Sequence, residues 1–203
     1  MSSMHDYASF DHNRATVGRW LGVGSLMLAG GFANLVVWLR DLTGIEYFVQ
    51  ASLTTGAIYA VLHYLFNKFI WKVKIFKVPD LSGHWSIKGT TLNEDGSEKY
   101  PWDGKLDIEQ SWEKIAIRLE TKSSESYSYT ATLAKLAGTS GGWRLSYSYS
   151  NTPHMQFSHE LNGHKGFCEV IFSENLKTAR ANYFNSNGRR TFGVMDLERE
   201  SND

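Results

Sequence analysis

Two short stretches in the second half of the chain alternate tyrosine with small polar residues. They are residues 126–130, which read SYSYT, and residues 145–149, which read LSYSY. A tyrosine offers a flat ring for stacking and a hydroxyl for hydrogen bonding, and nucleobases stack on such rings. The two stretches are expected to pair as neighbouring strands. Pairing predicts one aromatic patch formed by four residues: Tyr127, Tyr129, Tyr147 and Tyr149.

Four further polar side chains lie on flanking or nearby strands: Arg118, Arg144, Arg180 and Asn182. An arginine fork suits the oxygens of a phosphate group. Together with the tyrosines, these residues predict a site for a ligand that contains bases and phosphates. The structural alternative is that the tyrosines are ordinary strand residues and the arginines point to solvent. Arg118 is out of phase with Ile117 and Leu119, so it points outward if those two residues fill the core.

Charge and motifs exclude several other functions. From Val78 onward the chain has 14 Lys and Arg residues against 17 Asp and Glu residues. This balance argues against binding of long nucleic acid, which depends on many phosphate contacts. No P-loop, G-x-S-x-G or H-E-x-x-H motif is present, and His154, His159 and His164 do not share a strand face. We therefore expect no catalytic residue, no metal site and no cofactor, and we do not expect an enzyme.

Residues 79–203 alternate apolar and polar residues with the period of β-strands. Polar residues 93–104 are expected to form a loop, and Asn162-Gly163 and Asn187-Gly188 to form tight turns. The predicted strands are residues 84–92, 105–111, 114–121, 126–136, 143–150, 156–161, 166–172, 178–184 and 191–199. The pattern predicts an all-β, antiparallel, up-and-down barrel of about eight strands, because closure removes exposed strand edges. A sandwich is the alternative.

One local motif supports closure into a barrel. Gly83-His84-Trp85 opens the first predicted strand, and Arg199 lies near the end of the last. A Gly-x-Trp start with a late arginine is similar to barrels of the lipocalin and avidin type, in which the arginine covers the tryptophan in a cation–π contact. We therefore expect Trp85 and Arg199 to have a structural role.

Ahead of this domain lie two runs without charged residues, Trp20 to Leu39 and Tyr47 to Asn67. A bilayer core needs about 20 apolar residues per helix, and aromatic residues lie at the ends of both runs. We predict a transmembrane hairpin at residues 20–71, with spans at about 20–39 and 47–67 and a polar connector that contains Arg40, Asp41 and Glu46. A buried pair of soluble helices would normally carry a charged face, and a signal peptide has a shorter apolar region.

Small residues recur every fourth position in both runs. The two ridges are Ser25, Ala29 and Ala33 in the first run, and Ser52, Gly56 and Ala60 in the second. Smooth ridges allow helices to approach closely in lipid. The ridges either pack the first helix on the second or also pack neighbouring copies of the chain, and the sequence favours the simpler arrangement.

Basic residues predict the orientation in the membrane. The segment before the first run has two of them, the connector has one, and the stretch after the second run has four lysines: Lys68, Lys72, Lys74 and Lys77. The positive-inside rule places both termini in the cytoplasm. We therefore predict a cytoplasmic segment at 1–19, the hairpin at 20–71, a basic linker at 72–78 and a cytosolic ligand-binding barrel at 79–203. The single cysteine, Cys168, excludes an internal disulfide and suits a reducing compartment.

The whole layout resembles one family, from about residue 15 to the end. A transmembrane hairpin, a lysine-rich stalk and the segment Pro79 to Trp85 that opens a barrel are similar to the two-transmembrane β-barrel effectors of bacterial CBASS antiphage systems, which are CD-NTase-associated proteins. The resemblance implies a multi-pass protein of the bacterial inner membrane. It implies that the barrel binds a cyclic dinucleotide or related cyclic oligonucleotide made by a CD-NTase. It also implies that the protein then forms a homo-oligomer and disrupts the lipid bilayer, which kills the infected cell.

Two other functions remain open from the sequence. A membrane-tethered carrier or sensor of a small apolar ligand would have an apolar lumen and would bind lipids without responding to cyclic nucleotides. A membrane-anchored enzyme would depend on a carboxylate or histidine in the lumen. The resemblance supplies no residue-by-residue match for the pocket, so the ligand-binding residues named above rest on strand patterns alone.

Overall fold

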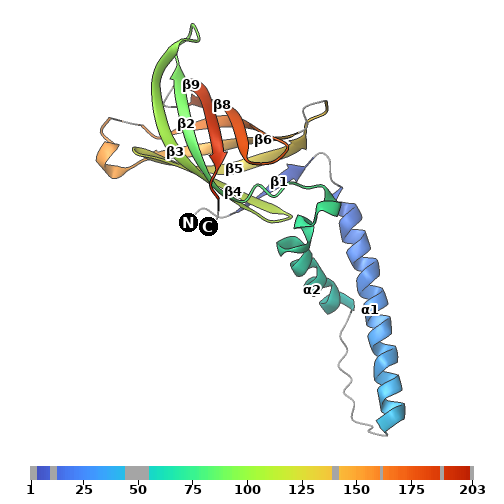
Figure 1. Ribbon diagram of the computed structural model, residues 1–203. Helices are drawn as coiled ribbons and strands as arrows, with labels where there is room; N and C mark the ends of the chain where they lie inside the picture. Colours follow the sequence, from blue (N-terminus) through green and yellow to red (C-terminus); the bar gives the residue numbers. More distant parts are fainter. Residues whose placement is uncertain are drawn as a thin grey trace. The chain divides into compact units, whose positions relative to one another are not determined.

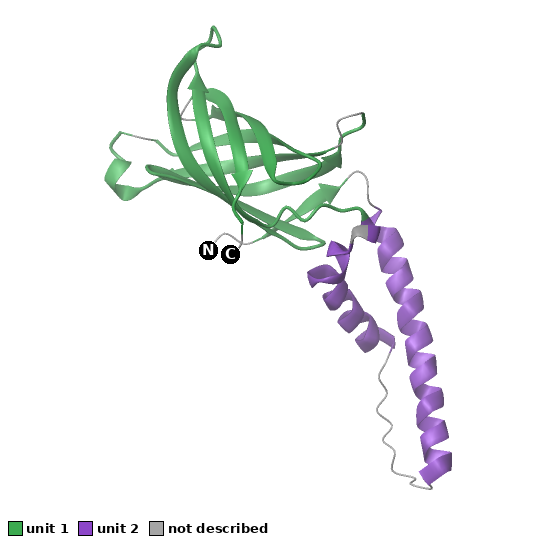
Figure 2. Ribbon diagram, viewed as in Figure 1, with its two compact units in different colours: residues 1–11, 77–203 green, residues 12–76 purple. Residues whose placement is uncertain are grey.

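The computed structural model describes residues 4–9, 13–43, 55–138, 142–160, 162–187 and 190–201. The chain divides into two compact units, one of residues 1–11 with 77–203 and one of residues 12–76 (Figure 2). The first unit is a β-sheet structure and the second is helical. Each unit is described by itself.

The helical unit contains α1 (Arg14–Thr43) and α2 (Thr55–Lys68), followed by two short 3₁₀ helices, η1 (Ile70–Lys72) and η2 (Lys74–Phe76). α1 has 30 residues, which corresponds to about 45 Å of helix and exceeds the bilayer core of about 30 Å. Among the described residues it is the one helix long and apolar enough to cross a membrane, and little of it is buried. α2 packs against α1.

The bounds of α1 differ from the predicted first span. The helix begins six residues earlier, where the side chain of Asn13 accepts a hydrogen bond from Thr16 N–H (3.2 Å) and caps the first turn. It also continues through Arg40 and Asp41 to Thr43, so these two residues of the predicted connector are helical. The helix extends beyond its apolar run because backbone hydrogen bonds do not require apolar side chains. Arg40 in the last turn is also favourable, since a basic residue there interacts with the negative end of the helix dipole. Residues 44–54, including Ser52 and the start of the predicted second span, lie outside the described residues.

The other unit is a sheet whose strand pairing closes on itself (Figure 1). Its strands are β1 (His5–Ser9), β2 (Gly83–Leu92), β3 (Glu98–Gln110), β4 (Lys114–Thr121), β5 (Ser124–Lys135), β6 (Trp143–Pro153), β7 (His164–Phe172), β8 (Thr178–Ser186) and β9 (Phe192–Arg199). β2 to β9 form an antiparallel up-and-down series in which β2 pairs with β9. The prediction of an antiparallel sheet of eight or nine strands is confirmed for this series.

β1 was not predicted, because residues 1–19 were predicted to be only a cytoplasmic segment ahead of the first membrane span. It pairs antiparallel with the start of β4 and parallel with residues 131–133 of β5. β4 and β5 pair directly only at residues 118–120 with 125–127. β1 therefore fills the part of the seam where β4 and β5 have separated. The alternation of apolar and polar residues in this five-residue segment is too short to predict a strand from sequence, because only one of its side chains points inward.

Two further segments differ from the prediction. Residues 98–104 belong to β3 instead of a loop, although they include Pro101 and Gly104. β3 pairs with β2 along this stretch, whereas its pairing with β4 begins at Gly104. Pro101 therefore lies where β3 has no partner on its β4 side, so its missing N–H costs no hydrogen bond to β4. The predicted strand at 156–161 is wrong, because residues 155–157 form the 3₁₀ helix η3 (Met155–Phe157), which Phe157 N–H closes by donating to His154 O.

The closed end of the barrel has the predicted tryptophan and arginine. Trp85 is fully buried and packs edge-to-face on Phe172, with ring centroids 5.1 Å apart. Its indole Nε1 donates to Leu81 O (3.3 Å). The Arg199 guanidinium lies 5.4 Å from the Trp85 ring centroid and donates to Ser82 O. The predicted cation–π contact is confirmed, and it seals one end of the core.

We expect Arg199→Ala to lower the free energy of unfolding by about 1–2 kcal/mol, because it removes a partly buried cation–π contact. Arg180→Ala is the matched control. Arg180 bonds Asp196 (3.1 Å) on the surface with its side chain 87% exposed, so its loss should change stability by no more than about 1 kcal/mol. Denaturant unfolding of the full chain in detergent measures both. Equal effects of the two variants would show that Arg199 does not stabilise the closed end.

Candidate functional site: a cavity inside the barrel

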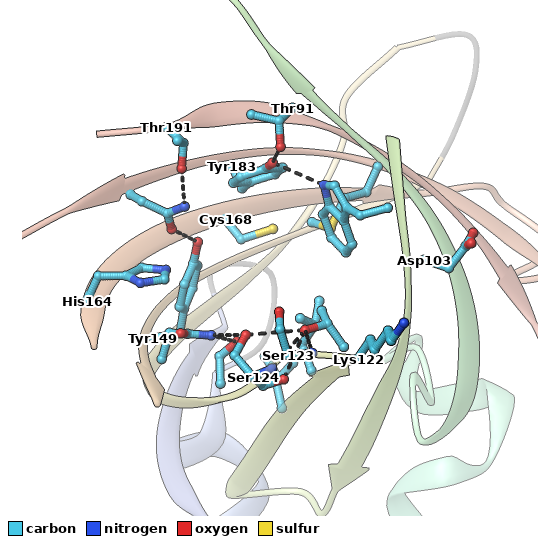
Figure 3. A pocket seen from close by; sticks show the side chains of 18 of the residues that line it. Thr91, Asp103, Lys122, Ser123, Ser124, Tyr149, His164, Cys168, Tyr183 and Thr191 are labelled. Atoms are coloured by element: carbon cyan, nitrogen blue, oxygen red, sulfur yellow. Dashed lines mark hydrogen bonds between the residues drawn. The ribbon is translucent and has the colours of Figure 1, made fainter. Parts of the chain in front are cut away.

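The opposite end of the barrel encloses a cavity of about 460 Å³ (Figure 3). Side chains from every strand except β1 line it. Its volume falls within the range of roughly 300–1,000 Å³ that is typical of small-molecule sites. The lining combines aromatic rings with hydroxyl, amide and charged groups, so it suits a ligand with both flat and polar parts.

Hydrogen bonds hold the aromatic wall in place. Trp102 Nε1 donates to the Tyr183 hydroxyl (3.2 Å), which also bonds the Thr91 hydroxyl (2.8 Å). The Trp102 and Tyr183 rings meet edge-to-face, with centroids 5.8 Å apart. Tyr149 donates to Asn185 Oδ1 (2.6 Å). Rings fixed in this way offer flat surfaces for stacking without a further loss of side-chain freedom.

Tyr147 stands beside Tyr149 on the same wall, with ring centroids 6.0 Å apart. Burial raises the pKa of the Tyr147 phenol well above its usual value. Burial likewise raises the pKa of the neighbouring Cys168 thiol to about 12. Both groups are therefore neutral at physiological pH, and Cys168 is not a reactive thiolate.

Polar and charged groups complete the cavity. Asn151 Nδ2 donates to the hydroxyls of Ser124 (3.0 Å) and Ser126 (3.5 Å). Lys122, at the turn between β4 and β5, brings a positive charge, and Asp103 brings a negative one. Figure 3 shows Lys122 and Asp103 on one side of the cavity and His164 on the other. An ammonium group beside several hydroxyls is suitable chemistry for an anionic oxygen.

The structure divides the four predicted tyrosines between two faces. Tyr147 and Tyr149 line the cavity, whereas the Tyr129 side chain is 47% exposed and Tyr127 packs on the outer side near Arg118. The prediction of one patch of four tyrosines is therefore wrong. Its error is one of register, because Ser128 stands opposite Tyr149 and Ala131 opposite Tyr147. In β6 the tyrosines point inward, while in β5 the serines do.

The predicted arginines and Asn182 lie on the outer face of the barrel. Arg118 bonds Glu125 (3.0 Å) and Glu120 (2.9 Å). Arg144 lies 3.8 Å from Glu169, Arg180 pairs with Asp196, and Asn182 is exposed. None of these four lines the cavity. Ile117 is buried among the inward residues, so the outward direction considered for Arg118 holds.

Three side chains on the outer face lie close enough together to bind a metal ion, but one of them already accepts hydrogen bonds from neighbouring residues. Among the described residues, Glu120, Glu125 and His154 bring ligand atoms within 4.8 Å of one another. Glu125 accepts hydrogen bonds from Tyr127 (2.5 Å) and Arg118 (3.0 Å), and these bonds lower the pKa of its carboxyl group. We therefore assign no metal to this group.

The sequence reasoning missed several residues that line the cavity. Tyr183 and Asn185 follow Ala179 and Ala181 on one face of β8, and this period-two row was readable in the sequence. The residues predicted from sequence, Arg180 and Asn182, alternate with this row and lie on the other face of β8. Trp102 was missed because its strand was interpreted as a loop. Lys122 had no signal, since a turn lysine is usual on a protein surface.

Comparison with known proteins identifies the family. Residues 76–199 match the family model "Cap15, cyclic dinucleotide receptor domain", and residues 15–72 match "Cap15, TM helices". The chain is also 35% identical over 200 residues to the CD-NTase-associated protein 15 of Yersinia aleksiciae, with 92% of each chain covered. The chain belongs to the Cap15 family. The resemblance to CBASS effectors is thereby confirmed, and Cap15 proteins combine a cyclic dinucleotide receptor domain with transmembrane helices.

The position of the cavity agrees with this assignment. Every residue that lines it falls within the part of the chain that matches the Cap15 receptor domain. The matched family is one of receptors and is not an enzyme family. β1 lies outside both matched ranges, although it belongs to the same unit as the receptor strands.

Proposed function

We propose that this chain is an antiphage effector whose barrel binds a cyclic dinucleotide, made by a partner CD-NTase, inside the cavity. Binding then drives the chains to assemble through their membrane helices, and the assembly disrupts the inner membrane. The observation that carries the proposal is an aromatic and polar cavity inside the domain that matches the cyclic dinucleotide receptor family.

Each chemical part of a cyclic dinucleotide has a suitable partner in the cavity. The bases stack against two pairs of rings in the aromatic wall, Tyr147 with Tyr149 and Trp102 with Tyr183, because every base has a π-face. Base-edge groups meet the amides Asn151 and Asn185. The phosphates lie toward Lys122 and the serine hydroxyls beside it. The six predicted residues on the outer face have no part in this site.

We further propose that both termini lie in the cytoplasm and that the chain crosses the membrane twice. The length and exposure of α1 and the match of residues 15–72 to a family of transmembrane helices support this arrangement. The lysines after α2 lie at the cytoplasmic surface, where each contributes about 1 kcal/mol of attraction to anionic lipids. The barrel is then in the compartment in which the CD-NTase makes its product.

The proposed assembly uses the small residues of α2. Gly56 and Ala60 are exposed, whereas Ser25 of α1 is buried and its hydroxyl donates to Gly22 O (2.8 Å). Among the described residues, Gly56 and Ala60 of this ridge are therefore uncovered, and we propose that they pack against a second copy. Close backbone approach at small residues is a main source of helix association in lipid.

Ligand binding activates the protein only if the ligand binds the assembled state more tightly. A change from mostly inactive to mostly active needs about 5.5 kcal/mol of differential binding. Each chain brings its own cavity to an assembly, so several ligands share this free energy.

The proposal is tested by thermal unfolding of the full chain in detergent with cyclic di-AMP, cyclic di-GMP, cyclic GMP–AMP and cyclic UMP–AMP. One of them at a hundredfold excess over its Kd should stabilise the barrel by about 2.7 kcal/mol. The linear dinucleotide is the control for ring closure. A fatty acid is the test of the apolar-carrier alternative, and a melting shift with the fatty acid alone would overturn the proposal.

A further inference from the structure

β1 occupies a seam that the other eight strands leave partly open. Asp6 pairs with Lys114 on one side, and Ala8 pairs with Thr132 on the other. Tyr7 points inward between them and is 3% exposed. Removal of β1 would leave unpaired backbone groups along both β4 and β5 and would uncover the core beside Tyr7. β1 therefore completes the pairing between β4 and β5 in this structure.

One buried amide ties together both connections of the barrel to the membrane helices. Gln110 Nε2 donates to the Tyr7 hydroxyl (3.2 Å) and to Pro79 O (3.2 Å), and Gln110 Oε1 accepts from Leu81 N–H (2.9 Å). Tyr7 lies in the strand just before α1, and Pro79 and Leu81 open the chain that follows η2. Only residues 10–13 separate β1 from α1, a distance of about 17 Å at full extension.

The seam also reaches the cavity. Ile117 and Ser126 line the cavity, one on each side of the seam. Beyond the short direct pairing of β4 and β5, Ile117 N–H donates to the Ser128 hydroxyl (3.0 Å). The same hydroxyl bonds His5 Nε2 of β1 (2.8 Å). Ser128 therefore joins a cavity-lining residue of β4 to β1 through two hydrogen bonds to one oxygen.

We propose that β1 is a removable seam strand that couples the cavity to helix α1. A ligand in the cavity separates β4 from β5 at Ile117 and Ser126, which breaks the bonds to Ser128 and releases β1. While β1 is in the seam, α1 is held by a short tether and the helices do not assemble. This inference rests on the proposed function, and it assigns to that function its regulating element.

Two disulfides test whether β1 must move. Asp6→Cys with Lys114→Cys locks β1 to β4, and Ala8→Cys with Thr132→Cys locks β1 to β5. Both pairs are in register, at a separation that suits a disulfide, while Cys168 is buried and inert. Lys88→Cys with Asp196→Cys is the matched control, because it joins two exposed paired residues of β2 and β9.

Full-length protein is placed in dye-loaded vesicles of phosphatidylethanolamine and phosphatidylglycerol, with the four cyclic dinucleotides of the melting experiment. Oxidised β1 locks should bind ligand more weakly than wild type, because the coupling between ligand binding and β1 release is reciprocal. At saturating ligand they should release dye at least about tenfold more slowly. Reduction should restore release, and the oxidised control pair should match wild type throughout.

The outcomes separate this inference from the proposed function. Normal dye release by an oxidised β1 lock would overturn the inference, since β1 would not need to leave the seam. An unchanged ligand affinity in the lock would overturn it also, because a ligand that releases β1 must bind the locked barrel more weakly. If wild type neither binds nor releases dye with any of the four compounds, the proposed function itself fails.

Discussion

Tyr149→Ala is expected to weaken binding of the cyclic dinucleotide by about tenfold to a hundredfold, because a base stacked on an aromatic ring contributes about 1–3 kcal/mol. Tyr149 lies on the cavity wall, and its hydroxyl is fixed by Asn185. Removal of the ring leaves an opening where the base would stack and removes the hydrogen bond that Asn185 Oδ1 accepts from Tyr149, whereas Asn185 Nδ2 still donates to the Thr191 hydroxyl (2.7 Å). Isothermal titration of the full chain in detergent measures the change in Kd.

Tyr129→Ala is the matched control for this prediction. It removes the same side chain from the neighbouring strand, but Tyr129 is 47% exposed on the outer face. Its Kd should stay within about twofold of wild type, as for a surface substitution remote from the site. Tyr149→Phe separates the contribution of ring stacking from that of the hydroxyl, because it keeps the ring and removes only the hydroxyl. If Tyr129→Ala weakened binding as much as Tyr149→Ala, the ligand would not occupy the cavity.

Gly56→Leu is expected to abolish membrane damage while the barrel still binds ligand. Gly56 is exposed on α2, so among the described residues a leucine there has room within one chain. In an assembly it would hold neighbouring backbones apart at the small-residue ridge, where close approach supplies the packing energy. Permeability of expressing cells to a membrane-impermeant dye, together with chemical cross-linking of the protein in membranes, measures the effect.

Ala57→Leu is the control for bulk in the helix. It adds a leucine to the next residue of α2, which is also exposed but lies about 100° around the helix axis from Gly56. This variant should still assemble and permeabilise cells. Undiminished dye entry with Gly56→Leu would remove the ridge from the mechanism, and equal loss in both variants would show a general effect of bulk on α2.

Several features of this protein were predictable because they depend on local pattern. Uncharged runs of about 20 residues predicted membrane helices, since each backbone group in lipid must bond within its own helix. Alternation of inward and outward residues predicted β2, β4 to β9 and the second half of β3, residues 105–110. Trp85 and Arg199 were paired correctly, because a chain that runs up and down brings its first and last strands together when the sheet closes.

Other features depend on register and were decided by the tertiary structure. The sequence SYSY occurs in both β5 and β6, but the tyrosines face the cavity in only one of them. A shift of one residue in a strand turns every side chain to the other face, and nothing within either stretch specifies its phase. Pro101 shows the same limit, because a proline is compatible with a strand only where the neighbouring edge is free.

By itself, the sequence determined a membrane-helix unit joined to an antiparallel β domain, and its resemblance pointed to CBASS effectors. The tertiary structure alone decided which tyrosines line the cavity, that Trp102 and Tyr183 stand with them, and that β1 completes the barrel. The physical reason is that hydrophobic runs and strand alternation are encoded in neighbouring residues. A cavity wall and a strand seam, in contrast, exist only where residues far apart in the chain are brought into register.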